Sequence, residues 1–254
     1  MNILITGAAK RIGAELAVSL ATPENHVLLH FNTSQKQAYA VQTQVLARGA
    51  RCTLIQADLS TEVGCSQLVE AIFEVVDNLD LLINNAAEFS YDLPTAFEYE
   101  KLAHILRVNL IAPAYLMKEI GNRLPAPSTS LMVNIVDQKV KNLNPDYFSY
   151  TLAKCALAAA SELYAMIFAE KGIRVISISP GVTLPSGPQT ADDYISSTKA
   201  TPLGRSSTPA DIASAISFAL LCKSITGANI VIDGGESLVR RERDIAFWDS
   251  AEAP

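Results

Sequence analysis

Short apolar runs alternate with longer amphipathic segments along the whole 254-residue chain. The runs expected to form strands are 2–6, 26–31, 51–56, 80–83, 130–136, 173–178 and 228–232. Helical patterns lie between them near 11–21, 35–48, 61–77, 101–123, 148–171 and 209–222. Because the runs are rich in Ile, Leu and Val and do not alternate with polar residues, the strands should be buried on both faces. The pattern predicts an α/β fold with a doubly wound, parallel, seven-stranded sheet and helices on both faces.

No Pro-, Gly- or Ser-rich linker divides the chain, so residues 1–254 are expected to form a single domain. One long segment, 181–208, carries no strong strand pattern and is interrupted by Pro185, Pro188, Pro202 and Gly204. It follows the sixth strand, at the carboxyl edge where open α/β sheets bind ligands. Since connections of this length usually serve as lids or binding loops, we predict a substrate loop at 181–208.

Composition excludes several classes of function. The net charge is −6 and the pI is about 5.1, which argues against a general affinity for nucleic acid or anionic membranes. The four cysteines form no CxxC pair and the three histidines lack the spacing of metal ligands, so neither disulfides nor a metal site are expected. No apolar stretch reaches membrane-spanning length and no signal peptide is recognisable, so a cytoplasmic protein is expected.

Tyr150 and Lys154 lie four residues apart in an expected helix and therefore share a face. An ammonium beside a phenol favours the phenolate, so Tyr150 should exchange a proton nearer neutral pH than a free Tyr. Asp137 closes the apolar run 130–136, so a strand end and a helix face can converge on one reacting atom. Asn109 falls within a helix, where Asn is a poor helix former, and is expected to be buried and hydrogen-bonded, which a functional role does not exclude. A Tyr/Lys pair alone is more often ordinary surface or core, so the remaining motifs must decide.

The turn after the first strand reads Thr6-Gly7-Ala8-Ala9-Lys10-Arg11-Ile12-Gly13. Its two glycines permit close backbone approach, and the following helix start offers free N–H groups to a pyrophosphate. The middle position of a GxGxxG motif is occupied by Arg11, and two glycines also suit an ordinary strand–helix turn. Lys10 and Arg11 favour the phosphate interpretation because they place two cations where a phosphate would lie, with Ile12 completing the loop.

The second strand ends at Asn32-Thr33-Ser34, without the carboxylate that usually holds the ribose 2′-hydroxyl of NAD. Hydroxyls with nearby cations suit a 2′-phosphate, so NADPH is favoured over NADH. After the third strand, Asp58 and Leu59 can hold the adenine, although Asp58 fits an N-cap-like loop residue equally well.

Small residues follow the fourth strand, where Asn85-Ala86-Ala87 would let a flat ring approach the backbone. Pro180-Gly181 follows the sixth strand and would face the nicotinamide. Both segments stand at the carboxyl ends of their strands, so they should meet at one edge of the sheet.

Taken together and in order, these motifs resemble the short-chain dehydrogenase/reductases over nearly the full length of the chain. The resemblance rests on Thr6-Gly7, Gly13, Asp58, Asn85-Ala86, Asn109, Tyr150, Lys154, Pro180-Gly181 and Asp233-Gly234-Gly235. It implies a single dinucleotide-binding domain of Rossmann type, hydride transfer to a small-molecule substrate, and a homotetramer. It also implies Tyr150 as acid, Lys154 as anchor of the nicotinamide ribose and Asn109 as organiser of a water relay.

Within that family the segments 6–13, 84–89 and 233–240 are similar to the pteridine reductases and to bacterial dihydromonapterin reductases. Those enzymes also carry Asp where most of the family carries a catalytic Ser, and here that residue is Asp137. An ionised carboxylate would repel the alkoxide that forms from a carbonyl, but it suits the basic ring nitrogens of a pterin. A flat pterin ring could stack on Phe89. Two alternatives remain: a generic reductase of a small carbonyl compound, and a non-catalytic NADP-sensing protein in which Asp137 marks lost activity.

The chain departs from these relatives in two places. Ala87 replaces the Gly of the wider family, where pteridine reductases often have Ser, and Thr33 replaces an Arg, leaving Ser34, Arg11 and Lys36 for the 2′-phosphate. By the same resemblance, the tail after Gly235 is expected near a neighbouring subunit's active site, and its acidic end at 249–254 is expected to fray.

Overall fold

The computed structural model describes residues 1–185 and 189–247, and in them seven parallel strands form one sheet. The strands are β1 (Asn2–Ile5), β2 (His26–Phe31), β3 (Arg51–Gln56), β4 (Leu81–Asn84), β5 (Leu131–Ile135), β6 (Arg174–Pro180) and β7 (Asn229–Ile232). Their order across the sheet is β3-β2-β1-β4-β5-β6-β7. The order reverses between β1 and β4, which is the point where a doubly wound sheet opens a crevice. The predicted α/β fold and its single domain are confirmed.

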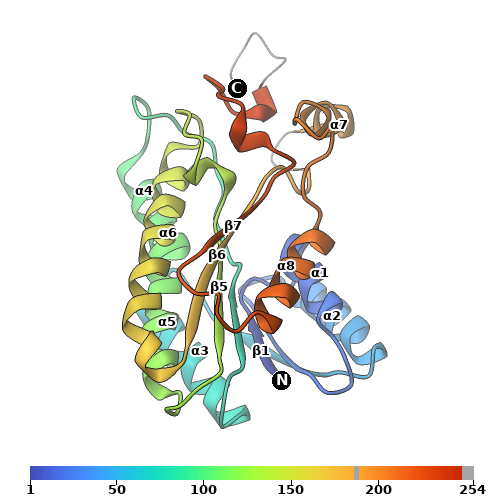
Figure 1. Cartoon of the computed structure of the whole chain (residues 1–254), viewed down its shortest axis with the longest axis vertical. Helices are drawn as coiled ribbons and strands as arrows, with labels where there is room; N and C mark the ends of the chain where they lie inside the picture. Colours follow the sequence, from blue (N-terminus) through green and yellow to red (C-terminus); the bar gives the residue numbers. More distant parts are fainter. Residues whose placement is uncertain (186–188, 248–254) are drawn as a thin grey trace.

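Helices cover both faces of the sheet (Figure 1). They are α1 (Arg11–Ser19), α2 (Gln35–Ala47), α3 (Glu62–Val75), α4 (Tyr99–Leu106), α5 (Ala112–Arg123), α6 (Phe148–Phe168), α7 (Ala191–Lys199) and α8 (Pro209–Leu221). Helices α3 to α6 lie on one side, whereas α1, α2 and α8 lie on the other. Along β1, Ile3 and Ile5 face the core under α1 and α8, while Leu4 faces the core under α3 and α5. This strand alternation explains why the strand sequences are apolar throughout.

The helix expected over 101–123 is present as one helical stretch, but its hydrogen-bond pattern changes in the middle, which the sequence did not predict. A π-helical turn at Arg107–Ile111 separates α4 from α5, and Asn109 lies within it. Pro113 has no N–H to donate to the carbonyl of Asn109, and its ring crowds that carbonyl, so the regular hydrogen-bond ladder is interrupted there. The segment 181–208, expected to be a loop, contains helix α7, which begins at a capping box of Thr190 and Asp193.

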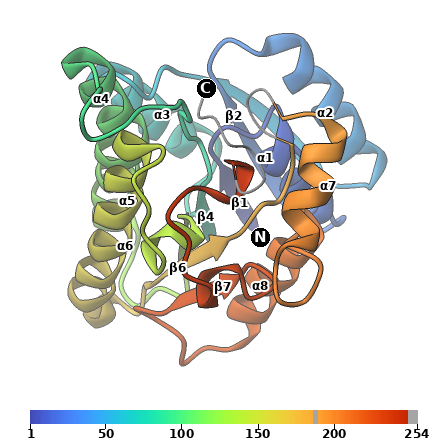
Figure 2. The same cartoon turned by 90° about the horizontal axis from the view of Figure 1, so that it is seen from above.

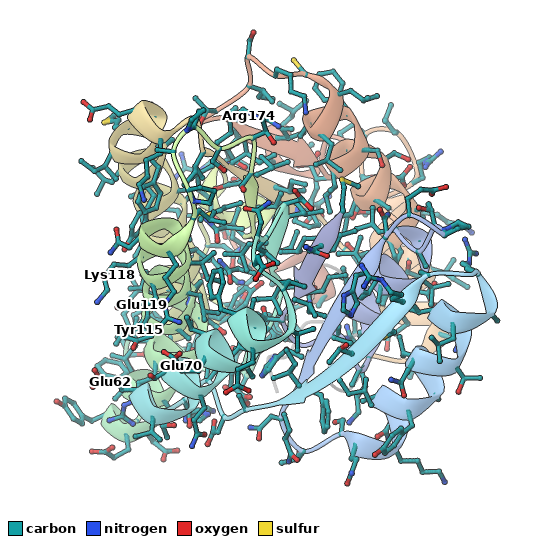
Figure 3. All side chains as sticks on the ribbon, turned by 90° about the horizontal axis from the view of Figure 1, so that it is seen from below. Glu62, Glu70, Tyr115, Lys118, Glu119 and Arg174 are labelled. Atoms are coloured by element: carbon teal, nitrogen blue, oxygen red, sulfur yellow. The ribbon has the colours of Figure 1, made fainter. Side chains whose placement is uncertain are left out.

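At the amino-terminal edge of the sheet, Arg174 begins β6 (Figure 3). Its guanidinium donates to the carbonyls of Ala219 and Cys222 at the end of α8, at 2.7 and 3.0 Å. A cation at a helix C-terminus satisfies the last free carbonyls, so Arg174 fixes α8 against the sheet.

In the described part of the chain, one helical stretch, 148–171, is long and apolar enough to cross a membrane. This stretch is α6 with its short 3-10 extension, and its inner side packs on β6 and carries the buried Tyr150 and Lys154. Its inner side is therefore that of a core helix, whereas Leu163, Met166 and Ile167 are exposed.

Candidate active site

The carboxyl ends of the strands, which Figure 2 views from above, open into a cavity of about 710 Å³. Its wall includes every cofactor residue predicted from the sequence. These are Gly7, Lys10, Arg11, Ile12, Gly13, Asn32, Thr33, Ser34, Asp58, Leu59, Asn85, Ala86, Ala87, Tyr150, Lys154, Pro180 and Gly181. Phe89 and Asp137 also line the cavity. Asn109 is the one predicted site residue that stands behind the wall.

The first turn can pack closely against itself and against the loop after β4 because two of its residues are glycines. A Cβ on Gly7, whose φ is +64°, would meet the Cα of Ala86 at 2.9 Å, and one on Gly13 would meet the carbonyl oxygen of Gly7 at 2.5 Å. No side chain in the described residues caps the amino end of α1, and its first turn carries no acid. Its free N–H groups therefore suit the pyrophosphate of a dinucleotide.

Asn85 ties this turn to the loop after β4. Its side-chain amide donates to the carbonyl of Thr6 at 2.9 Å, and the Thr6 hydroxyl accepts the N–H groups of Asn85 and Ala86, both at 3.0 Å. Asn85 and Thr6 therefore fix the two loops that would flank the cofactor.

His30 also fixes the turn that contains Gly7, and the sequence did not predict this role. Its Nδ1 accepts the N–H of Gly7 at 3.1 Å, and its Nε2 donates to the carbonyl of Ala57 at 3.1 Å. Burial lowers the pKa of His30 to about 4, so the ring stays neutral. A lone His in a strand pattern carries no local signal for such a contact, because its partner is 23 residues away.

At the ribose end, the loop after β2 is joined to the loop after β3. Asn32 donates to the Asp58 carboxylate at 3.4 Å, and Asp58 accepts the N–H of Ser60 at 2.9 Å. Hydrogen bonds from Ser60 lower the pKa of Asp58. The N-cap of α3 is Thr61, so Asp58 is a turn residue that also lines the cavity.

The catalytic residues expected from the strand end and the helix face do converge. The Tyr150 hydroxyl donates to Oδ2 of Asp137 at 3.0 Å, and Oδ1 of Asp137 accepts the N–H of Lys139 at 2.9 Å. Burial raises the pKa of Asp137, so this carboxyl can take up a proton closer to neutral pH than an exposed Asp. A proton donor and a proton acceptor are thus hydrogen-bonded to each other at the cavity wall.

The effect expected from Lys154 is wrong in its direction. Burial, and then the charge of Asp137, raises the pKa of Tyr150 well above its ordinary value. The Lys154 ammonium donates to the carbonyl of Ile135 at 2.7 Å and lies 5.5 Å from the centre of the Tyr150 ring. Burial also lowers the pKa of Lys154 to about 8. Desolvation therefore outweighs the lysine's charge, and Tyr150 is held as the protonated phenol.

Asn109 is buried and hydrogen-bonded, as expected. Its Oδ1 accepts the N–H of Glu88 at 2.7 Å and its Nδ2 donates to the carbonyl of Glu88 at 2.8 Å. Both polar atoms of the side chain thus support the loop that carries Phe89. Its role in a water relay stays a prediction.

Aromatic rings form the wall beside Tyr150. Phe89 stacks on Tyr147 with centroids 4.2 Å apart and meets Tyr150 edge-on at 4.8 Å. Tyr147 begins α6 in the left-handed region, at φ 55°, a conformation that is strained for a bulky residue. As the N-cap of α6 it lies outside the helix proper, so helical spacing from Tyr150 gave no signal for its place in the wall.

A buried carboxyl, Glu236, links two turns: the catalytic turn, named here for residues 137–139 after β5, and the turn after β6. It accepts the Gln138 side-chain amide at 2.9 Å and the N–H of Val182 at 3.3 Å. Burial, followed by the negative charge of Asp137, raises the pKa of Glu236 to about 8. Glu236 therefore carries a proton at neutral pH and links two loops of the cavity.

Replacement of Glu236 by Gln should flatten the dependence of stability on pH. A carboxyl with a pKa of about 8 when folded and 4.5 in its unperturbed state binds more protons when folded. Stability is therefore lost as pH rises from about 4.5 to 8. Both proteins contain His30, so its titration cancels in their difference, and between pH 6.5 and 8 we expect the free energy of unfolding to fall, relative to Glu236→Gln, by on the order of 1 kcal/mol per pH unit. Urea unfolding of both proteins from pH 6.5 to 8 measures this slope; parallel curves would contradict the assignment.

Comparisons with known proteins agree with this geometry. A family model described as enoyl-(acyl carrier protein) reductase matches residues 7–237. An uncharacterized oxidoreductase of Methylorubrum extorquens is 31% identical, over 91% of this chain and 96% of its own length. Pteridine reductase 1 of Leishmania tarentolae is 30% identical, over 93% and 96%. The structure of FolM alternative dihydrofolate reductase 1 from Brucella suis with NADP superposes with a TM-score of 0.89 at 34% identity, covering 94% and 96%. The chain belongs to the short-chain dehydrogenase/reductase family and is an oxidoreductase that uses a nicotinamide dinucleotide.

Proposed function

We propose that the protein reduces a pteridine-like substrate, of the dihydropterin or dihydromonapterin class, with NADPH. The observation that carries this proposal is the Tyr150–Asp137 hydrogen bond, because a carboxyl stands where a carbonyl reductase needs a neutral donor. The similarity to a pteridine reductase and to a FolM-type reductase supports it.

In this mechanism NADPH supplies the hydride. The amino end of α1 would bind its pyrophosphate, and Lys154 would hold the nicotinamide ribose. Tyr150 donates a proton to the reduced bond from a phenol that burial keeps protonated. Asp137 holds a proton at a ring nitrogen of the substrate, which its raised pKa permits. Phe89, stacked on Tyr147, presents a flat wall to the substrate ring.

NADPH should bind at least about tenfold more tightly than NADH, a difference of about 1.4 kcal/mol. The loop Asn32-Thr33-Ser34 offers no carboxylate to a ribose 2′-hydroxyl, while Arg11 and Lys10 line the same cavity. Fluorescence titration of both cofactors measures the ratio. The variant Arg11→Met should lower the ratio of the NADH to the NADPH dissociation constant. Equal affinities for the two cofactors in the unmodified protein would refute a 2′-phosphate site.

The alternatives are reduction of a small carbonyl compound and NADP sensing without turnover. NADPH oxidation with a panel of dihydropterins, quinones and simple carbonyls distinguishes the three. We expect turnover with dihydropterins at least tenfold above any carbonyl in kcat/KM. Turnover confined to carbonyls would favour the first alternative, and tight NADPH binding without any turnover would favour the second.

We also propose a cytoplasmic homotetramer. Leu163, Met166 and Ile167 are 65–70% exposed on the outer side of α6, and Leu221 at the end of α8 is 82% exposed. Exposed apolar side chains grouped on helices suit close packing between subunits. Light scattering coupled to gel filtration should give four times the monomer mass of 27.3 kDa. A monomer would contradict this assembly.

A further inference from the structure

Residues 243–247, called here the strap, lie over the cavity of their own chain. Figure 2 shows the C-terminal segment after β7 passing between the α6 side of the molecule and α7. Asp244, Ile245 and Ala246 line the same cavity as Tyr150 and Asp137. The tail, expected near a neighbouring subunit, thus completes a wall within one chain; its end at 248–254 lies outside the described residues.

The first anchor of the strap is an ion pair with Lys139 of the catalytic turn. The Asp244 carboxylate meets the Lys139 ammonium at 2.7 Å, and the two side chains are only 12% and 3% exposed. The ammonium also donates to Asn144 at 2.6 Å and to the carbonyl of Asp146 at 3.2 Å. Because the backbone N–H of Lys139 donates to Asp137, this pair is two hydrogen bonds away from Tyr150.

The second anchor is the fully buried carboxylate of Asp146. It accepts Nε of Arg243 at 2.8 Å, the N–H of Asp244 at 2.7 Å and the hydroxyl of Tyr91 at 3.1 Å. On the far side of the strap, Ser197 of α7 donates to the carbonyl of Ile245 at 3.3 Å. The strap therefore connects the catalytic turn with the helix of the substrate loop.

The strap also supports the aromatic wall. The Phe247 ring lies nearly parallel to Tyr147, at 6.0 Å and 12°, and meets Tyr91 edge-on at 5.4 Å. Tyr147 in turn stacks on Phe89. Loosening the strap should therefore disturb the surface on which a flat substrate rests, while leaving the glycine turn and Lys154 in place.

We propose that Asp244 is a positioning residue for substrate: paired with Lys139, it fixes the strap as the outer wall of the substrate end of the cavity in its own chain. The identity of the substrate used below rests on the proposed function. After burial, the charge of Asp244 is a lesser cause of the raised pKa values of Tyr150 and Asp137, which keep their own hydrogen bond, so the pair should act chiefly on substrate binding.

Steady-state kinetics of Asp244→Asn with NADPH and a dihydropterin test this role. KM for the dihydropterin should rise about tenfold, with kcat within about twofold and the NADPH dissociation constant unchanged. Glu242→Gln, an exposed neighbour, is the matched control and should behave like the unmodified protein. Arg243→Met, which removes the half-buried partner of Asp146, should also raise KM for the dihydropterin. This variant replaces Asp244→Asn in the test if Asp244→Asn does not fold.

A second readout does not depend on the substrate. Trypsin should cleave after Arg241 or Arg243 at least several-fold faster in Asp244→Asn than in Glu242→Gln, because the ion pair holds this segment down. If the protein reduces no dihydropterin, the proposed function is contradicted but the role of Asp244 is not. KM is then measured with whichever compound of the panel is reduced. If no compound is reduced, the cleavage rates alone test the role of Asp244. Unchanged KM and cleavage, or a fall in kcat at constant KM, would overturn the role of Asp244.

Mixed assemblies decide whether the strap serves its own chain. Subunits truncated after Glu242 are combined with full-length Tyr150→Phe subunits, so that turnover comes only from truncated chains. A strap that acts within its chain leaves KM high in the mixture, as in the truncated protein alone. Restoration of a low KM by the inactive partner would overturn the assignment.

Discussion

Tyr150→Phe should lower kcat for dihydropterin reduction by roughly 10²–10⁴-fold, the range typical of a lost general acid. The phenol is the donor of the 3.0 Å hydrogen bond to Asp137, and its raised pKa keeps it in the protonated form. The substitution removes one oxygen and leaves the ring that packs edge-on against Phe89. The fold and the cofactor turn should therefore be unaffected, and the NADPH dissociation constant should change less than about twofold.

The matched control for this prediction lies on the same helix. Tyr164 of α6 donates to the carbonyl of Ala114 at 3.0 Å and takes no part in the cavity wall. Tyr164→Phe should therefore lose one hydrogen bond, on the order of 1 kcal/mol of stability, and keep its kcat. A near-normal kcat in Tyr150→Phe would show that another group supplies the proton. An equal loss in both variants would point to general damage to α6.

The sequence predicted the scaffold well because the relevant signals are local. Runs such as 26–31 and 130–136 carry apolar residues on both faces, which suits a sheet covered on both sides. Gly7 and Gly13 also stand in one short turn, where close backbone approach requires them. The same reasoning placed Tyr150, Lys154 and Asp137 together, and the structure brings Tyr150 and Asp137 into direct contact.

The features that the sequence did not predict depend on distant partners or on burial. Glu236 contacts Gln138 across 98 positions of the chain, and Asp244, near the C-terminus, pairs with Lys139 in the middle of the sequence. No local period encodes such pairs. The direction of the Tyr150 pKa was missed for a different reason: spacing gives the nearness of Lys154, but desolvation is a property of the folded cavity.

Asp137→Ser should lower kcat/KM for a dihydropterin by roughly 10²-fold, while reduction of simple carbonyls stays equal or rises. The carboxyl has a task that a hydroxyl cannot perform: because its pKa is raised, it can take up a proton and hold it at a substrate nitrogen. For a carbonyl substrate the change is favourable, because a Ser hydroxyl donates to the oxygen that a carboxylate would repel.

The isosteric variant Asp137→Asn distinguishes charge and proton transfer from shape. Its single side-chain oxygen can accept the N–H of Lys139 at the Oδ1 position, with the NH2 group then facing the Tyr150 hydroxyl, but it cannot take up and release a proton. If proton handling is the task of this residue, Asn should be as poor with dihydropterins as Ser, while only Ser gains with carbonyls. Parallel kcat/KM measurements on both substrate classes test this. Because a carboxyl selected for nitrogen-containing rings should not be improved by a hydroxyl, faster dihydropterin reduction by the Ser variant would refute the role given to Asp137.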